Sequence, residues 1–164
     1  MRMKGGFALF VCAASLSLGG CSVEERGAKD LANAQFVEEQ SELREAVLSI
    51  KADIELSNIE GLQAAHLDSE KFTKFGPRGF ERQDVASTNE SEAAFFGSIA
   101  NVEYEIRDLK IDVFGEVGIA TYYYEASFLR DGRDVAVTGR QTFVFLKTDS
   151  GWKLVHEHGT VRRP

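Results

Sequence analysis

The chain has 164 residues, and its 26 acidic side chains outnumber 19 lysines and arginines, giving a formal net charge of -7 at pH 7. Such a surface repels polyanions, so we expect no nucleic-acid partner. The length is enough for one domain with a buried core. No stretch reaches the roughly 20 consecutive apolar residues of a membrane-spanning helix, so we expect no spanning segment.

The first twenty residues have the organisation of an export signal. Arg2 and Lys4 precede an apolar run over residues 7–18, as in a signal peptide. The run ends in Leu-Gly-Gly-Cys, which resembles the lipobox of bacterial lipoproteins, with Cys21 as the lipid acceptor. We therefore predict a lipoprotein signal peptide over residues 1–20 and lipidation of Cys21. The alternative is an ordinary secretory signal with an incidental cysteine.

Lipid on Cys21 would hold the protein on a membrane. Each buried CH₂ contributes about 0.8 kcal/mol, so one acyl chain binds marginally and the two or three of a lipoprotein bind stably. Ser22 rather than aspartate follows the cysteine, which in Gram-negative lipoproteins implies the periplasmic face of the outer membrane. Residues 21–31 are charged and lack aromatic side chains, which predicts a tether. Loss of Cys12 with the signal would leave no thiol for a disulfide.

Three helices are expected after the tether. The first is long, and one apolar stripe runs along it. The spacing of Ser57 and Glu60 is typical of a capping box, so a second helix should begin there and carry His66 on its apolar face. Asn89 with Glu92 indicates another cap and a third, short helix. The stripe of the first helix consists of Phe36, Leu43, Val47, Ile50 and Ile54.

The pattern then becomes alternating, as in strands. Apolar side chains change parity near Arg107 and Asp108, which indicates a β-bulge, and Asp131-Gly132 is a strong hairpin signal. Helices followed by a long antiparallel meander predict an α+β domain with its helices on one face of the sheet. The expected strands cover residues 72–75, about 102–113, 119–129, about 135–146 and 152 to about 161.

One of these strands should be covered on both faces. Residues 143–146 are apolar at both parities, whereas a half-exposed strand alternates. The helices can cover one face. A second subunit would cover the other, so we predict a homodimer; the amino-terminal segment is the alternative cover.

Two segments near the carboxyl end carry a family resemblance. Gly-Arg-Gln-Thr-Phe-Val-Phe at residues 139–145 and Gly-Trp-Lys-Leu-Val-His-Glu-His at residues 151–158 resemble the closing hairpin of SnoaL-like domains, in the nuclear transport factor 2-like superfamily. The second segment is also similar to the association domain of calcium/calmodulin-dependent protein kinase II. The resemblance implies a curved sheet wrapped around three helices, a cone with a cavity, over residues 32–164. Members range from ketosteroid isomerase to dehydratases and oligomerisation modules, so the fold alone identifies no chemistry.

The last strand contains the catalytic candidates. Trp152, His156 and His158 share parity, so we expect all three to point into the cone. Two histidines that titrate near neutral pH could act as acid and base, or hydrogen-bond a ligand. Alternatively, they bond buried groups and shape the core.

Other side chains complete the predicted ligand site. Arg140 shares a parity with Thr142 and could bind a carboxylate through two hydrogen bonds, or pair with an acidic side chain. The tyrosines could donate to an oxyanion or pack across strands. The predicted ligand-binding residues are His66, Tyr104, Tyr122, Tyr124, Arg140, Thr142, Trp152, His156 and His158.

A metal site is conceivable from the histidines. His156 and His158 with His66 could bind zinc, completed by Asp68 or Glu157. The spacing does not require it, because Glu157 has the opposite parity and His66 is remote in sequence. We therefore predict no metal and no cofactor.

The sequence thus predicts a membrane-anchored lipoprotein whose domain binds a small, partly apolar molecule. An isomerase, dehydratase or hydrolase with His156 or His158 as general base is the alternative, and a non-catalytic interaction module of the envelope is a third. Ketosteroid isomerase uses a tyrosine on its first helix, where this chain has Phe36, so the resemblance does not extend to that reaction. The sequence leaves open whether the domain is an enzyme.

Overall fold

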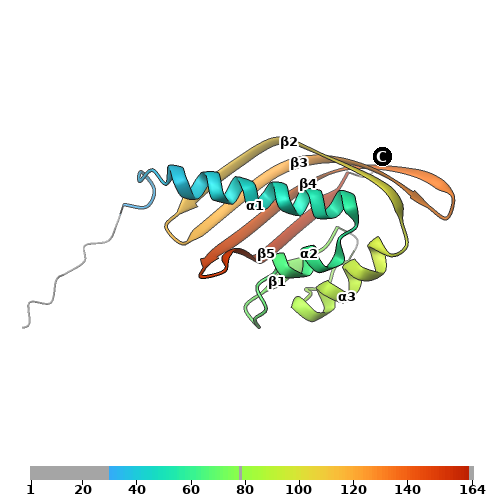
Figure 1. The fold of residues 1–164 in the computed structure, drawn as a ribbon, viewed down its shortest axis with the longest axis horizontal. Coiled ribbons are helices and arrows are strands. Elements are labelled where there is room, and N and C mark those ends of the chain that lie inside the picture. The colour runs from blue at the N-terminus through green and yellow to red at the C-terminus, as the bar shows by residue number, and fades with distance from the viewer. Residues whose placement is uncertain (1–29, 78, 163–164) are drawn as a thin grey trace, which may run out of the picture.

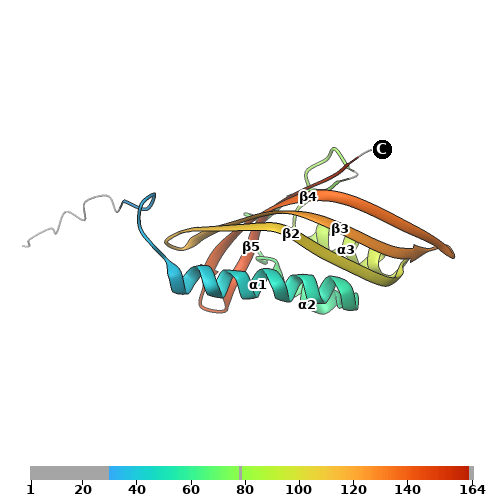
Figure 2. The same ribbon diagram turned by 90° about the horizontal axis from the view of Figure 1, so that it is seen from above.

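One five-stranded sheet carries three helices on one of its faces (Figures 1 and 2). The computed structural model describes residues 30–77 and 79–162, so the predicted signal peptide, Cys21 and most of the predicted tether lie outside it. The predicted α+β fold is confirmed. The helices are α1 (Val37–Leu56), α2 (Ile59–Ala65) and α3 (Val85–Phe96), and the strands are β1 (Thr73–Phe75), β2 (Ala100–Phe114), β3 (Val117–Arg130), β4 (Arg133–Thr148) and β5 (Gly151–Val161).

The sheet has the order β1-β5-β4-β3-β2. β2 to β5 form an antiparallel meander, and the short β1 adds to β5 in parallel. Asp131 and Gly132 have φ angles of 51° and 72° at the tip of the β3–β4 hairpin, as the Asp-Gly signal predicts. The sheet curves over the helices (Figure 2). Among the described residues, no helix has the length and apolar character to cross a membrane.

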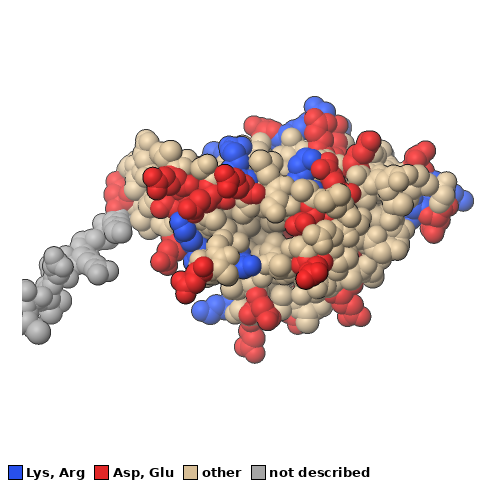
Figure 3. Space-filling model, viewed as in Figure 1, with Lys and Arg blue, Asp and Glu red and all other residues tan. Residues whose placement is uncertain are grey.

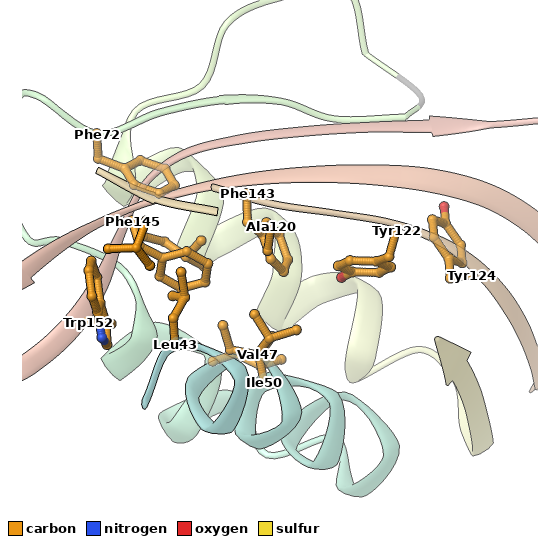
Figure 4. Packing of buried hydrophobic residues seen from close by; sticks show 13 residues of the cluster. Leu43, Val47, Ile50, Phe72, Ala120, Tyr122, Tyr124, Phe143, Phe145 and Trp152 are labelled. Atoms are coloured by element: carbon orange, nitrogen blue, oxygen red, sulfur yellow. The ribbon is translucent and has the colours of Figure 1, made fainter. Parts of the chain in front are cut away.

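The stripe predicted for the first helix is confirmed. Leu43, Val47 and Ile50 of α1 are buried against the sheet, and Figure 4 shows them facing the row of aromatic side chains that runs from Trp152 to Tyr124. A Cβ on Gly118 would lie 2.3 Å from Leu43 Cδ2, so glycine at this position of β3 permits the close approach of α1.

The predicted capping box at Ser57 is wrong. Ser57 has a φ of 50° and ends α1 in the left-handed conformation. Asn58 instead caps α2, and its side-chain oxygen accepts a hydrogen bond from the Gly61 N–H at 3.2 Å. In the tight turn between the two helices, Ser57 therefore ends α1 and Asn58 begins α2.

The predicted start of the third helix is also wrong. Asp84 caps α3, and its carboxylate accepts from the Ser87 backbone N–H at 2.8 Å while the Ser87 hydroxyl accepts from the Asp84 N–H at 3.0 Å. This reciprocal pair starts the helix five residues before the predicted cap. Asn89 and Glu92 consequently lie within α3, three positions apart and on one face.

Three register shifts interrupt the pairing of the described strands. The predicted one is confirmed, because the β2–β3 register shifts between Arg107 and Lys110, and another shift lies between Ala100 and Glu103. The shift in β5 was not predicted: Phe145 pairs with Leu154 and Val144 with His156, which leaves Val155 as an extra residue. After this bulge the parity of β5 is reversed.

Candidate functional site

A cavity of about 510 Å³ lies between the helices and the curved face of the sheet. Aromatic and aliphatic side chains form most of its wall, and a small group of charged side chains lies at one side. Figure 3 shows many acidic side chains on the surface over α1, whereas the wall of the cavity is mainly apolar. The apolar wall includes Ile50, Ile54, Phe95, Phe96, Tyr104, Tyr122, Tyr124, Phe128, Val137 and Phe143.

Four charged side chains meet at the cavity, and we refer to His66, Lys74, Glu92 and Glu157 as the buried charge cluster. His66 Nε2 lies 2.8 Å from Glu157 Oε1, and Lys74 Nζ lies 3.1 Å from Glu157 Oε2. Lys74 also donates to Glu92 Oε1. The side chains of His66 and Glu157 are only 3% and 6% exposed.

Four separate elements bring this cluster together. The parallel pairing of β1 with β5 sets Lys74 beside Glu157. The bulge at Val155 turns Glu157 toward the helices, next to Phe143. His66 ends α2, and the early start of α3 directs Glu92 toward the same point.

The charges of the cluster support one another. Burial raises the pKa of Glu157, but the charge of Lys74 and the hydrogen bond and charge of His66 lower it by more, so that it lies well below its ordinary value. Burial lowers the pKa of Lys74, but the charges of Glu157 and Glu92 raise it above its ordinary value. Glu157 is therefore an anion and Lys74 a cation inside the protein.

His66 is the member of the buried charge cluster whose ordinary pKa lies nearest neutrality. Burial lowers its pKa, but the hydrogen bond and charge of Glu157, with smaller contributions from Glu92 and Asn89, raise it above its ordinary value. Its Nδ1 lies 2.8 Å from Asn89 Oδ1, and its Nε2 faces Glu157 Oε1. Two oxygen partners suit the imidazolium, in which both ring nitrogens donate.

Three predicted tyrosines also line the cavity. The Tyr104 hydroxyl donates to the Tyr122 hydroxyl at 3.4 Å, and the rings of Tyr104 and Tyr124 stack with centroids 5.2 Å apart. Burial raises the pKa of both Tyr104 and Tyr122, so both remain neutral hydroxyls at physiological pH. Of the nine predicted ligand-binding residues, these three tyrosines and His66 line the cavity.

The predicted orientation of His156 and His158 is wrong. Because the Val155 bulge reverses parity, both rings lie on the sheet face away from the helices, against the Phe75 ring with centroids 6.0 Å away. His156 Nδ1 also lies 2.8 Å from Thr73 Oγ1. Neither histidine lines the cavity.

The remaining predicted ligand residues lie elsewhere. Arg140 and Thr142 share a shallow hollow with His158 on the sheet face away from the helices, and Arg140 Nε donates to Thr160 Oγ1 at 3.0 Å. Trp152 is buried in the core at the opposite end of the aromatic row from Tyr124 (Figure 4). Sequence reasoning missed Lys74 and Glu92, which line the cavity, and Asn89, which bonds His66. It considered Glu157 only as a zinc ligand.

A comparison with known families identifies the domain. Residues 44–163 match the model of the SnoaL-like domain. The chain belongs to the SnoaL-like family. A search of curated proteins finds no significant match.

Solved structures show that this SnoaL-like domain has the nuclear transport factor 2-like fold. A candidate dehydratase of that family from Streptomyces avermitilis is 18% identical, with 77% of this chain and 98% of that chain covered and a TM-score of 0.71. A superfamily protein from Salmonella enterica is 19% identical, with coverages of 77% and 93% and a TM-score of 0.70. A ketosteroid isomerase-like protein from Erwinia carotovora is 16% identical, with coverages of 79% and 100% and a TM-score of 0.66.

The SnoaL-like domain also contains a possible set of metal ligands. One ligand atom each of His66, Glu92 and Glu157 lies within 4.8 Å of the others. Lys74 bonds both carboxylates, so its ammonium group already supplies positive charge there and a metal ion would have to displace it. The zinc set considered from the sequence is not assembled, because His156 and His158 lie on the other face of the sheet.

The raised pKa of His66 predicts a pH-dependent contribution to stability. Replacing His66 with glutamine removes the ion pair with Glu157, and we expect a loss of about 3 kcal/mol in the free energy of unfolding. The advantage of the unaltered protein should be complete below about pH 6.5, the value for an unfolded histidine, and should shrink as pH rises through the pKa of folded His66. Urea unfolding of both proteins from about pH 5 to about pH 9, a range that includes the ordinary pKa of histidine, measures this difference in the free energy of unfolding.

The matched control is His158→Gln, because His158 is exposed on the far face of the sheet. This change leaves the buried charge cluster intact, so it should not reproduce the pH-dependent loss of His66→Gln. A loss in His66→Gln that is the same across the whole pH range would contradict a protonated His66 in the cluster.

Proposed function

We propose that the chain is a membrane-anchored lipoprotein whose SnoaL-like domain binds a small, mainly apolar molecule in its cavity. The observation that carries the proposal is the cavity itself, whose volume of about 510 Å³ and apolar wall suit a small organic ligand. Ligand sites in proteins have about 300 to 1,000 Å³, apolar walls and a few polar groups that orient the ligand. The buried charge cluster and the tyrosine hydroxyls are such groups.

Binding accounts for the geometry better than catalysis. The two histidines that the sequence offered as general bases lie outside the cavity. In the cluster, Glu157 accepts from both Lys74 and His66, so its two oxygens are already engaged. A general base needs an oxygen or nitrogen free to accept a proton from the substrate, so Glu157 does not fit that role.

Filling the cavity should abolish binding. Ala126 of β3 lines the cavity, and Ala126→Phe adds a ring there. We expect a fluorescent apolar probe such as phenylnaphthylamine to lose at least about tenfold in affinity, as measured by titration. Ala136→Phe is the control, since Ala136 is exposed on β4. Equal probe binding by Ala126→Phe and the unaltered protein would count against the cavity as the site.

The membrane anchor is proposed from the sequence of the amino-terminal segment. Cys21→Ser removes the thiol that would accept diacylglycerol. We expect this variant to be released from the membrane fraction of a Gram-negative host and to lose incorporation of labelled palmitate. Membrane attachment that persists in Cys21→Ser, without lipid, would overturn the anchor and leave the cavity proposal untouched.

We further propose that two copies associate through the sheet face that the helices leave uncovered. Tyr123 is 58% exposed there, and Phe75 is 38% exposed. Lys110 and Arg140 lie on this face together with Asp108, so it has charges of both signs and can complement a second copy of itself.

Light scattering of the full chain should give the mass of a dimer, and Tyr123→Glu should shift it toward monomer because it buries a carboxylate in the contact. A monomer at micromolar concentration for the unaltered protein would refute the dimer.

A further inference from the structure

One oxygen in the cavity lacks a hydrogen bond. Glu92 Oε2 is buried and has no hydrogen-bond partner among the described residues, whereas Glu92 Oε1 accepts from Lys74. His66 Nε2 lies 3.8 Å from this oxygen, which is beyond hydrogen-bond range. Glu92 lines the cavity, so its side chain lies next to a molecule bound inside.

Two neighbouring side chains direct their donors elsewhere. His66 directs its ring nitrogens to Asn89 and Glu157, and the Gln83 amide donates to Ser91 Oγ at 3.0 Å. A buried acceptor without a donor is unfavourable, so a ligand that brings a donor to this oxygen gains affinity.

The charges around Glu92 indicate what kind of donor fits. With His66 as imidazolium, the cluster has two cations and two carboxylates, so it is balanced without the ligand. An ammonium group would add a third cation to this enclosed site. A carboxylate would face Glu92 Oε2, since the hydrogen bonds of His66 are already directed elsewhere. An uncharged hydroxyl satisfies the oxygen and leaves the balance unchanged.

The side chains of the cavity wall beside Glu92 indicate which apolar group the ligand carries. Phe95 and Phe96, from the same helix, lie at 5.2 Å with their rings edge to face, and Phe95 meets Phe128 in the same way at 5.6 Å. Such rings pack well against a flat ring system.

We propose that the ligand is an uncharged aromatic alcohol or phenol whose hydroxyl donates to Glu92 Oε2 while its ring packs against the aromatic wall. This inference rests on the proposed function, since it names the class of molecule that the cavity binds. It makes Glu92 the residue that selects the ligand, and it gives the rest of the cluster the task of holding that carboxylate in place.

Four naphthalenes of similar size test the donor requirement on the full chain. Naphthol offers a neutral donor, methoxynaphthalene lacks a donor, naphthoate is an anion and naphthylmethylamine is a cation at neutral pH. We expect calorimetric titration to give naphthol an affinity about tenfold higher than methoxynaphthalene, as befits one hydrogen bond to a charged group, and to rank both charged compounds below naphthol.

Glu92→Gln then tests the assignment to one oxygen. The amide oxygen of glutamine should stay with Lys74 and its NH₂ group should face the cavity, which turns the acceptor into a donor. Naphthol should lose its advantage, and methoxynaphthalene should bind at least as well as naphthol. Glu90→Gln, an exposed position on the same helix, is the control and should keep the naphthol preference.

The outcomes separate the two proposals. If none of the four compounds binds, the proposed binding function fails. If they bind without preference for naphthol, or if Glu92→Gln keeps that preference, the cavity still binds ligands and the assignment to Glu92 is overturned. The series on the unaltered chain decides the donor requirement even if circular dichroism shows that Glu92→Gln does not fold.

Discussion

The structure of the site depends on the burial of one carboxylate. A charged group inside a protein is tolerated only when opposite charges and donors surround it, and Glu157 obtains them from His66 and Lys74. Because these partners come from the end of α2 and from β1, the requirement fixes both against β5. The cavity therefore has one wall of fixed charges, and the rest of its wall is free to be apolar.

Periodic features of the sequence predicted most of the fold. The stripe of α1 and the alternation of the long strands repeat over many residues, so packing and local preference agree, and Asp131-Gly132 encodes its turn directly. Helix starts were harder, because Asn89 with Glu92 and Asp84 with Ser87 both have the spacing of a cap and only one pair is used.

The site itself was only partly predictable. His66, Tyr104, Tyr122 and Tyr124 were identified, since they lie on elements whose faces the pattern predicts. Trp152, Leu154, His156 and His158 share one parity in the sequence, and only the apolar Val155 between Lys153 and Glu157 departs from the alternation. That single departure does not show that Val155 is an extra residue. One inserted residue turns every later side chain of the strand to the opposite face. As a result Glu157, and not His156 or His158, faces the cavity. One signal was present in the sequence: Lys74 is a charged residue in a very short strand, beside the apolar Phe72 and Phe75.

The pairing of His66 with Glu157 joins residues 91 positions apart in the chain. Contacts between such distant segments form only after a large loss of chain entropy, which slows folding. β5 pairs with β4 on one side and with β1 on the other. Before β5 docks, His66 and Lys74 lack their shared partner Glu157, so the domain can collapse around α1 and the central strands while its cavity is incomplete. Completion of the cavity is thus expected to be a late event of maturation, separable in time from formation of the hydrophobic core.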